Sequence, residues 1–266
     1  MKLNIKSVYD YWNRESCGTS FTNKQKYSKE YFDEIESVRY ELEPMIKPFA
    51  EFEKYKDKNI LEVGVGAGTD FINYVRNGAI ASGVDLTDEA IDNIKHRLLI
   101  ESLNPKCLQK SNAENLPFKN NEFDLTYSWG VIHHSPDTKK CLSEIIRVTK
   151  PGGEVKIMVY NRKSVSALWV WIRFCLLKGK FWKNITYAIE NNVESFGTKA
   201  YTVEEMKEMF NDFQDIKLKK ISTVITWCDK ATISKSMAVK IFHRILIFLG
   251  GGDRVGWFML INANKI

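Results

Sequence analysis

The sequence predicts an α/β fold built on a parallel sheet with helices on both faces. From residue 59 to residue 160, five short apolar runs alternate with helical stretches, which is typical of such a sheet. A glycine-rich turn, Gly64 to Gly68, joins the first apolar run to the first helical stretch. The run Pro151-Gly152-Gly153 is expected to end the last of these helices and to turn into the fifth strand.

Four parts follow one another along the chain. Residues 1–56 are expected to form an N-terminal helical lid segment, in which Pro44 and Pro48 interrupt the helix. The expected core at 57–160 is followed by a helical cap insert at 161–200, and residues 201–266 complete the core with a helical excursion at 231–249. The expected strands are Asn59–Val63, Ala79–Asp85, Lys106–Lys110, Phe123–Trp129, Glu154–Tyr160, Ile216–Thr226 and Trp257–Ala263; the expected core helices are Thr69–Arg76, Asp88–Glu101, Thr138–Thr149 and Tyr201–Phe210.

Composition sets the broad class of the protein. The 266 residues are 44% hydrophobic and 27% charged, which is ordinary for a globular chain and excludes a disordered or fibrous one. The five cysteines form no CxxC pair, so they indicate a reducing compartment rather than a disulfide framework or a zinc finger. The N-terminus has no apolar signal sequence, and the longest apolar run, Val165 to Leu177, contains Arg173. We therefore expect a cytoplasmic protein.

The glycine-rich turn is the first candidate binding element. It reads Glu62-Val-Gly64-Val-Gly66-Ala-Gly68, an ExGxGxG pattern at the end of a strand, where a ligand can approach the backbone closely. A dinucleotide fingerprint would place glycine where Thr69 stands, and no GK[ST] follows as in a phosphate-binding loop. The acid beside the turn suits a ligand that carries an amine, although a tight turn alone could explain the glycines.

Three further elements follow the ends of later strands. Asp85 and Leu86 end the second strand, where a carboxylate can hold a ribose diol. The third strand is followed by Ser111-Asn112-Ala113-Glu114, which can reach an adenine edge. The fourth strand ends with Ser128 and Trp129 at the mouth of the expected crevice.

With these elements in order, the chain resembles the class I S-adenosylmethionine (SAM)-dependent methyltransferases, in particular their type 11 small-molecule branch. The phrases that carry the resemblance are LEVGVGAGTD, GVDLTDEAI, SNAENLPF, FDLTYSWGVIHHSPDT, EIIRVTKPGGEV and GWFMLINANK. The resemblance implies a Rossmann-like sheet of seven strands whose last hairpin makes one strand antiparallel. It also implies that SAM is bound and S-adenosyl-L-homocysteine released. The implied cofactor contacts are Glu62, Gly64, Gly66 and Gly68 for the methionine part, Asp85 for the ribose, Asn112, Ala113 and Glu114 for the adenine, and Ser128 and Trp129 beside the sulfonium. Leu86 is expected as a further cofactor contact.

Candidate catalytic and substrate residues are less specific. His133 and His134 follow the fourth strand and are expected as general bases, because an ordinary histidine pKa of about 6.5 suits proton transfer; packing or capping is the alternative. Tyr160 and Arg162 are expected near the substrate, and Tyr11 and Trp12 in a lid. No metal is expected, because adjacent histidines rarely bind one ion and no third ligand is in register.

The positive charge of the protein is concentrated in the last third of the chain. Residues 161–266 hold 17 basic and 9 acidic residues, an excess larger than the net charge of +6 of the whole chain. Residues 164–183 and 235–249 are basic, aromatic and apolar, so they predict either a cap over the site or peripheral contact with a membrane. Binding of nucleic acid is disfavoured, because these two segments contain too many apolar residues for a surface that follows a phosphate backbone. The expected activity is in-line methyl transfer to a small or lipid-like metabolite, achieved mostly by proximity and desolvation. The alternative is a SAM-binding regulatory or interaction module without methyl transfer.

Overall fold

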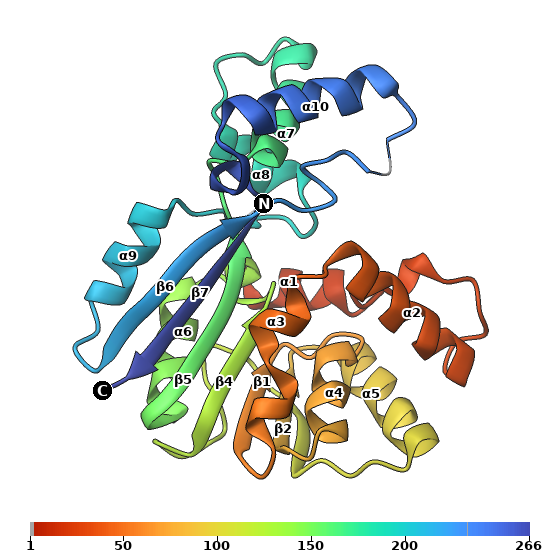
Figure 1. Cartoon of the computed structure of the whole chain (residues 1–266), viewed down its shortest axis with the longest axis vertical. Helices are drawn as coiled ribbons and strands as arrows, with labels where there is room; N and C mark the ends of the chain where they lie inside the picture. The colour runs from red at the N-terminus through yellow and green to blue at the C-terminus, as the bar shows by residue number, and fades with distance from the viewer. Residues whose placement is uncertain (1–2, 233) are drawn as a thin grey trace.

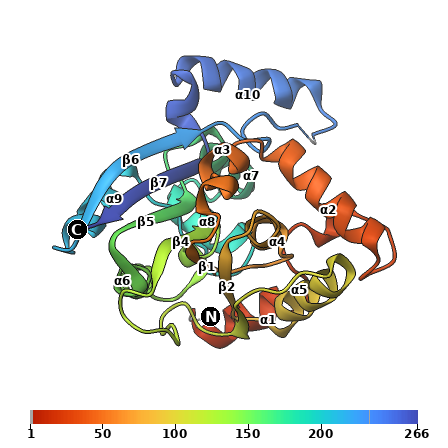
Figure 2. The same ribbon diagram turned by 60° about the horizontal axis from the view of Figure 1, so that its bottom comes forward.

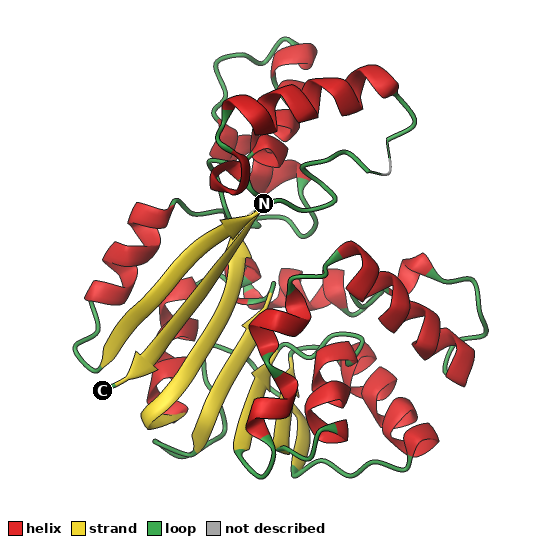
Figure 3. Ribbon diagram, viewed as in Figure 1, coloured by secondary structure: helices red, strands yellow, loops and turns green. Residues whose placement is uncertain are grey.

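The structure is a computed structural model that describes residues 3–232 and 234–266. Within these residues, seven strands form one sheet in the order β3-β2-β1-β4-β5-β7-β6 (Figures 1 and 3). Strand β7 runs antiparallel to β5 and β6, and the other neighbouring strands run parallel, which confirms the predicted fold class. The strands are β1 (Asn59–Val63), β2 (Ile80–Asp85), β3 (Cys107–Lys110), β4 (Phe123–Trp129), β5 (Thr149–Tyr160), β6 (Ile216–Val224) and β7 (Phe258–Lys265).

One prediction at the start of β5 is wrong. The strand begins at Thr149 rather than Glu154, so the run Pro151-Gly152-Gly153 lies inside it instead of forming a separate turn. Pairing between β4 and β5 is irregular there, with a register shift between Phe123 and Leu125. Gly152 has a φ of 78°, and the strand accommodates it at this irregularity.

Helices of the central part cover the two faces of the sheet in separate layers (Figure 3). The core on one face includes residues of α3 (Ile46–Ala50), α4 (Thr69–Arg76) and α5 (Asp88–Glu101). The core on the other face includes residues of α6 (Thr138–Val148) and α9 (Val203–Asn211). This arrangement leaves the carboxyl ends of the parallel strands at one edge, where open α/β sheets bind ligands.

The segment before the sheet consists of short helices that begin at polar caps. The side chain of Asn4 accepts a hydrogen bond from the Ser7 backbone, and that of Ser28 accepts one from Tyr31, so each satisfies a helix N-terminus. The elements are α1 (Ile5–Trp12), η1 (Thr19–Phe21), α2 (Lys29–Leu42), α3 and η2 (Phe52–Tyr55), with η3 (Ile132–His134) following β4.

A second group of helices sits beyond the carboxyl ends of the parallel strands, at the top of Figure 1 and seen again in Figure 2. The ring of Trp169 lies 6.1 Å from that of Phe242 and 5.2 Å from that of His243, so residues from the 161–200 and 231–249 segments pack together. None of the helices in the described part of the chain has the length and apolar character needed to cross a membrane. The elements of this group are α7 (Val165–Phe174), η4 (Leu176–Lys178), α8 (Ile185–Asn192), α10 (Met237–Leu249) and η5 (Gly252–Val255).

Candidate active site

A cavity of about 840 Å³ opens at the carboxyl ends of the strands. Its walls come from the N-terminal segment, from the loops after β1, β2, β3 and β4, and from α7 and the segment after α8. Most of the residues expected at the site therefore meet around one space. Those that line it are Tyr11, Trp12, Glu62, Gly64, Gly66, Asp85, Leu86, Asn112, Ala113, Trp129, His134 and Tyr160.

The glycine-rich turn leaves the backbone open to the cavity at Gly66. Gly64 and Gly66 have φ values of 82° and 51°, which glycine adopts at little cost. A Cβ at Gly64 would lie 2.2 Å from Cγ2 of Val131, whereas a Cβ at Gly66 would meet nothing within 4 Å. The empty space beside Gly66 is part of the cavity, so a ligand can approach the backbone there.

Beside this turn lies a buried carboxylate without a partner. Glu62 is 3% exposed, and its Oε2 has no hydrogen-bond partner among the described residues. Burial, together with nearby Asp70, raises the pKa of Glu62 well above its usual value, and Arg39 opposes that shift. A buried carboxyl group that lacks a donor fits a ligand that brings a positive N–H group.

Asp85 is placed by hydrogen bonds at the end of β2. One oxygen accepts the backbone N–H of Gly66 at 3.0 Å, and the other accepts the backbone and hydroxyl of Thr87 at 2.9 and 2.8 Å. Burial raises the pKa of Asp85, and these donors oppose the rise. The side chain is thus fixed at the edge of the cavity, between the turns after β1 and β2.

Two residues at the end of β4 face different ways. Trp129 lines the cavity and donates its indole N–H to Oε2 of Glu43 at 3.1 Å. The hydroxyl of Ser128 instead donates to the carbonyl of Val63 at 3.0 Å, and the residue does not line the cavity. Neighbouring residues on a strand point to opposite faces, which explains the difference.

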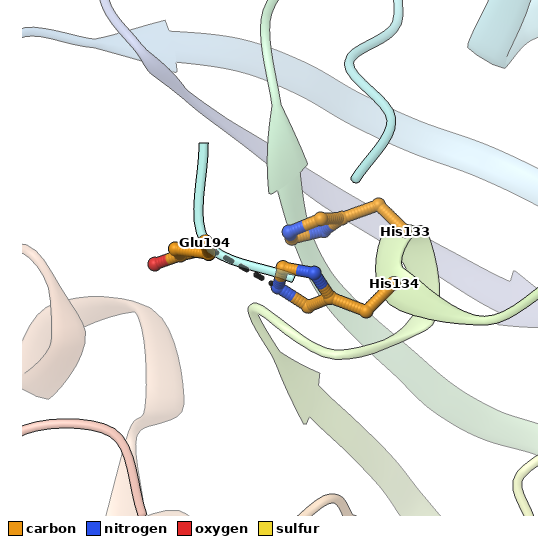
Figure 4. A group of neighbouring side chains, drawn as sticks. All are labelled: His133, His134 and Glu194. Carbon is orange, nitrogen blue, oxygen red and sulfur yellow. Dashed lines mark ion pairs between the residues drawn. The ribbon is translucent and has the colours of Figure 1, made fainter. Parts of the chain in front are cut away.

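The histidine pair is also divided. His134 lines the cavity, and its Nε2 lies 3.3 Å from Oε2 of Glu194 (Figure 4). Its Nδ1 lies within 3.1 Å of the hydroxyls of Ser195 and Thr198. His133 is fully buried outside the lining, and neither ring nitrogen has a hydrogen-bond partner among the described residues. Burial holds the pKa of His133 well below its usual value, so its ring is neutral.

Comparison with known proteins identifies the domain. A family model described as a methyltransferase domain matches residues 61–157. Residues 61–157 therefore form a methyltransferase domain. S-adenosyl-L-methionine is the cofactor of this methyltransferase domain, and the unpartnered Glu62 and the open backbone at Gly66 fit such a cationic ligand.

Relatives of the methyltransferase domain act on different substrates. The chain is 30% identical to norajmaline N-methyltransferase of Rauvolfia serpentina over 113 residues, which are 42% of this chain and 39% of that protein. It spans less than half the length of the curated relatives it matches. A geranyl diphosphate C-methyltransferase from Streptomyces coelicolor has the same fold, with a TM-score of 0.64, 16% identity and 98% of each chain covered. The [4+2]-cyclase SpnF also has this fold, with a TM-score of 0.58, 12% identity, and 97% of this chain and 92% of that one covered.

Several expected site residues lie outside the cavity of the methyltransferase domain. Besides Ser128 and His133, these are Gly68, Glu114 and Arg162. Gly68 caps α4, and Glu114 accepts hydrogen bonds from the Ser135 hydroxyl and the Asp137 backbone. Arg162 pairs with Glu205 and lines a separate hollow of about 520 Å³.

The sequence analysis did not single out four acids of the cavity lining, which are Glu15, Glu43, Asp70 and Glu194. Asp70 accepts hydrogen bonds from the hydroxyls of Tyr40 at 3.1 Å and Tyr127 at 2.9 Å. Its position, two residues after the last glycine of the turn, was a signal that could have been used. Glu43 and Glu194 stand in no recognisable pattern, and only the fold brings them to the cavity.

Proposed function

We propose that this chain transfers the methyl group of SAM to a small-molecule acceptor and releases S-adenosyl-L-homocysteine. The observation that carries the proposal is the match of residues 61–157 to a methyltransferase domain, together with the cavity in which the unpartnered Glu62 lies. The volume of about 840 Å³ is near the upper end for ligand pockets, which leaves room for an acceptor beside the cofactor.

We assign the cofactor contacts by position in the cavity. Glu62 would pair with the ammonium group of the methionine part, and the backbone at Gly64 and Gly66 would face that part. Asp85 would hold the ribose hydroxyls. Leu86, Asn112 and Ala113 would contact the adenine, and Trp129 would form the wall near the reacting carbon.

The protein has to align the acceptor with the methyl carbon and keep water out, because the sulfonium is itself a good leaving group. Tyr11 and Trp12 belong to α1, which covers one side of the cavity, and the ring of Trp12 lies 5.0 Å from that of His134. We propose that this segment acts as a lid that closes over the reactants.

The test is transfer of label from methyl-labelled SAM to an extract of small molecules and lipids, followed by partition between organic and aqueous phases. Label in any product is the expected result. SAM binding without any transfer of label would instead favour the alternative, a binding or regulatory module. The fold alone does not decide between them, since the [4+2]-cyclase SpnF, which has the same fold, is named for a different reaction.

The finer proposal concerns a hydrophobic or lipid-like acceptor and contact with a membrane surface. Large apolar side chains are exposed on α10 and around η4: Phe248 is 84% exposed, Leu177 70% and Trp182 68%. Lys178, Lys180, Lys235 and Arg244 are exposed in the same segments. Apolar side chains rimmed by cations suit an anionic lipid surface.

Sedimentation with lipid vesicles tests this contact. We expect binding to vesicles that contain phosphatidylglycerol and little binding to phosphatidylcholine alone. Phe248→Ser should weaken binding about tenfold, because burying a phenylalanine contributes about 1.5 kcal/mol or more. Leu99→Ser is the matched control, since Leu99 is 77% exposed on α5. Equal effects of the two substitutions, or no binding at low salt, would refute the contact.

A further inference from the structure

Glu194 reaches the cavity from the segment 161–200, which the sequence predicted to be a helical cap insert. It follows α8, and Asn192, Val193 and Glu194 all line the cavity. Its φ of 51° is in the left-handed region, which is uncommon for a residue other than glycine. Such conformations cluster at functional sites, where the surrounding structure maintains them.

Two side chains hold the Glu194 carboxylate. The hydroxyl of Tyr160 lies 3.0 Å from Oε1 and 2.9 Å from Oε2, and Nε2 of His134 lies 3.3 Å from Oε2 (Figure 4). Tyr160 is itself fixed by stacking on Trp257, with ring centroids 4.3 Å apart. A carboxylate has about four acceptor positions, so at least one remains for a donor in the cavity.

The charges around the cavity favour a cationic occupant. The described lining includes six acids and only three arginines, and it has no lysine. One of the arginines, Arg39, already contacts Asp70 at 3.3 Å and Glu43 at 4.0 Å. Burial raises the pKa of Glu43 and of Glu62, which means that these groups ionise at a cost unless a cation lies nearby. The cofactor would supply positive charge for Glu62, whereas Glu194 follows α8 and belongs to neither of the turns after β1 and β2.

Apolar side chains complete the same part of the cavity. Val170 and Phe174 of α7 line it, as does Trp227. The ring of Trp12 lies 5.0 Å from that of His134 on the N-terminal side. This environment suits a molecule with one positive group and a hydrophobic body.

We propose that the methyl acceptor is an amine with a hydrophobic body, and that Glu194 binds its ammonium group and receives its proton. This inference rests on the proposed methyltransferase function. The ammonium gives one proton to the Glu194 carboxylate, and the resulting nitrogen lone pair forms the N–C bond. The S–C bond breaks, its electron pair stays on sulfur, and the product leaves as a methylated ammonium. The proton on Glu194 passes to water when the site opens.

A bound metal ion is the competing use of these side chains, since ligand atoms of His133, His134 and Glu194 lie within 4.8 Å of one another. His133 is buried and lies outside the cavity lining, with its ring 4.1 Å from that of Tyr160. An ion held there would leave Glu194 less able to receive an amine. Metal analysis of the purified protein therefore belongs to the test, and one ion per chain removed together with Glu194→Gln would overturn the proposal.

The experiment is calorimetric binding of octylamine, octanol and octanoate to the protein loaded with S-adenosyl-L-homocysteine. We expect octylamine to bind at least about tenfold more tightly than octanol, with octanoate weakest. Glu194→Gln should remove most of that preference for octylamine, while the affinity for S-adenosyl-L-homocysteine should change less than about threefold. Glu190→Gln is the matched control, because Glu190 lies on α8 outside the cavity lining and should keep the preference.

Methyl transfer from labelled SAM to octylamine is the second readout, where Glu194→Gln should lower kcat/KM by about 10²-fold or more. Octanoate binding as tightly as octylamine, no binding of octylamine, or an unchanged preference in Glu194→Gln would overturn the amine proposal.

Failure of the proposed methyltransferase function would give different results. Either the wild-type protein would bind no SAM, or it would bind SAM and label nothing in a broad extract. Repeating the amine comparison without cofactor measures amine selectivity in both cases.

Discussion

The open space beside Gly66 leads to a sharp prediction about cofactor binding. Gly66→Ala adds one methyl group that points into the cavity and meets no protein atom within 4 Å. The loss of stability should therefore come only from the backbone, because a residue with a side chain adopts a φ of 51° at a cost of about 1–2 kcal/mol. If the cofactor passes close to this backbone, the same methyl group occupies its space, and affinity should fall by about 10²-fold.

Gly64→Ala provides the comparison, because its Cβ would meet protein instead of open space. At a φ of 82° it has the same backbone penalty, and its Cβ would lie 2.2 to 2.8 Å from three atoms of the Val131 side chain. Overpacking of this kind adds about 1–3 kcal/mol, so the total loss of stability should reach about 2–5 kcal/mol. Urea unfolding and calorimetric binding of S-adenosyl-L-homocysteine measure the two effects. If Gly66→Ala bound the cofactor within about threefold of wild type, the reasoning would be refuted.

Three other predictions concern single residues. Asp85→Asn should weaken SAM binding by about 10- to 10²-fold in calorimetry, because it removes the charged acceptor beside Gly66. Hydrogen bonds to charged groups contribute about 1.5–3 kcal/mol. Unchanged affinity would exclude the ribose assignment. Asp229→Ala should lower the free energy of unfolding by about 3–5 kcal/mol. The buried carboxylate accepts hydrogen bonds from three backbone N–H groups and two hydroxyls, which the substitution would leave without an acceptor. A loss below about 1 kcal/mol, measured by urea unfolding, would contradict this. Burial lowers the pKa of His133, so below about pH 6.5 the unfolded chain binds a proton that the folded chain cannot, and stability should fall by about 1.4 kcal/mol per pH unit. His133→Phe should lose that part of the slope when unfolding is measured near pH 7.5 and 5.5, and an unchanged slope would show that His133 is not the group responsible.

The sequence predicted the central strands well because their signal is local. Asn59–Val63 and Phe123–Trp129 are strands with the predicted bounds, and their apolar runs are buried in the middle of the sheet. Thr149–Tyr160 was predicted less well, since proline and two glycines usually mark a turn. The irregular pairing with β4, which depends on a neighbouring strand, accommodates them there.

Site residues on the turns after β1 and β2 were predictable for the same reason. Gly66 lies in the turn that follows β1, and Asp85 ends the adjacent parallel strand β2, so the topology brings them within hydrogen-bond distance. Ser128 shows a limit of reading a motif as a block, because the alternation of a strand turns it away from the cavity that Trp129 lines. Glu194 is beyond such reasoning. It lies 60 residues after His134 in an insert, and only the path of that insert places the two side chains together.

The insert and α10 join two proposals that would otherwise be separate. Outside, these helices expose apolar and basic side chains, which suit an anionic lipid surface. Inside, the same insert contributes Val170, Phe174 and Glu194 to a cavity with an excess of acids. An amine with a hydrophobic body accumulates at anionic lipid surfaces by the same two forces, apolar burial and charge attraction. The opposite charges of the outer surface and the inner cavity therefore fit one acceptor, because the surface that attracts the protein also concentrates the molecule that the cavity would select.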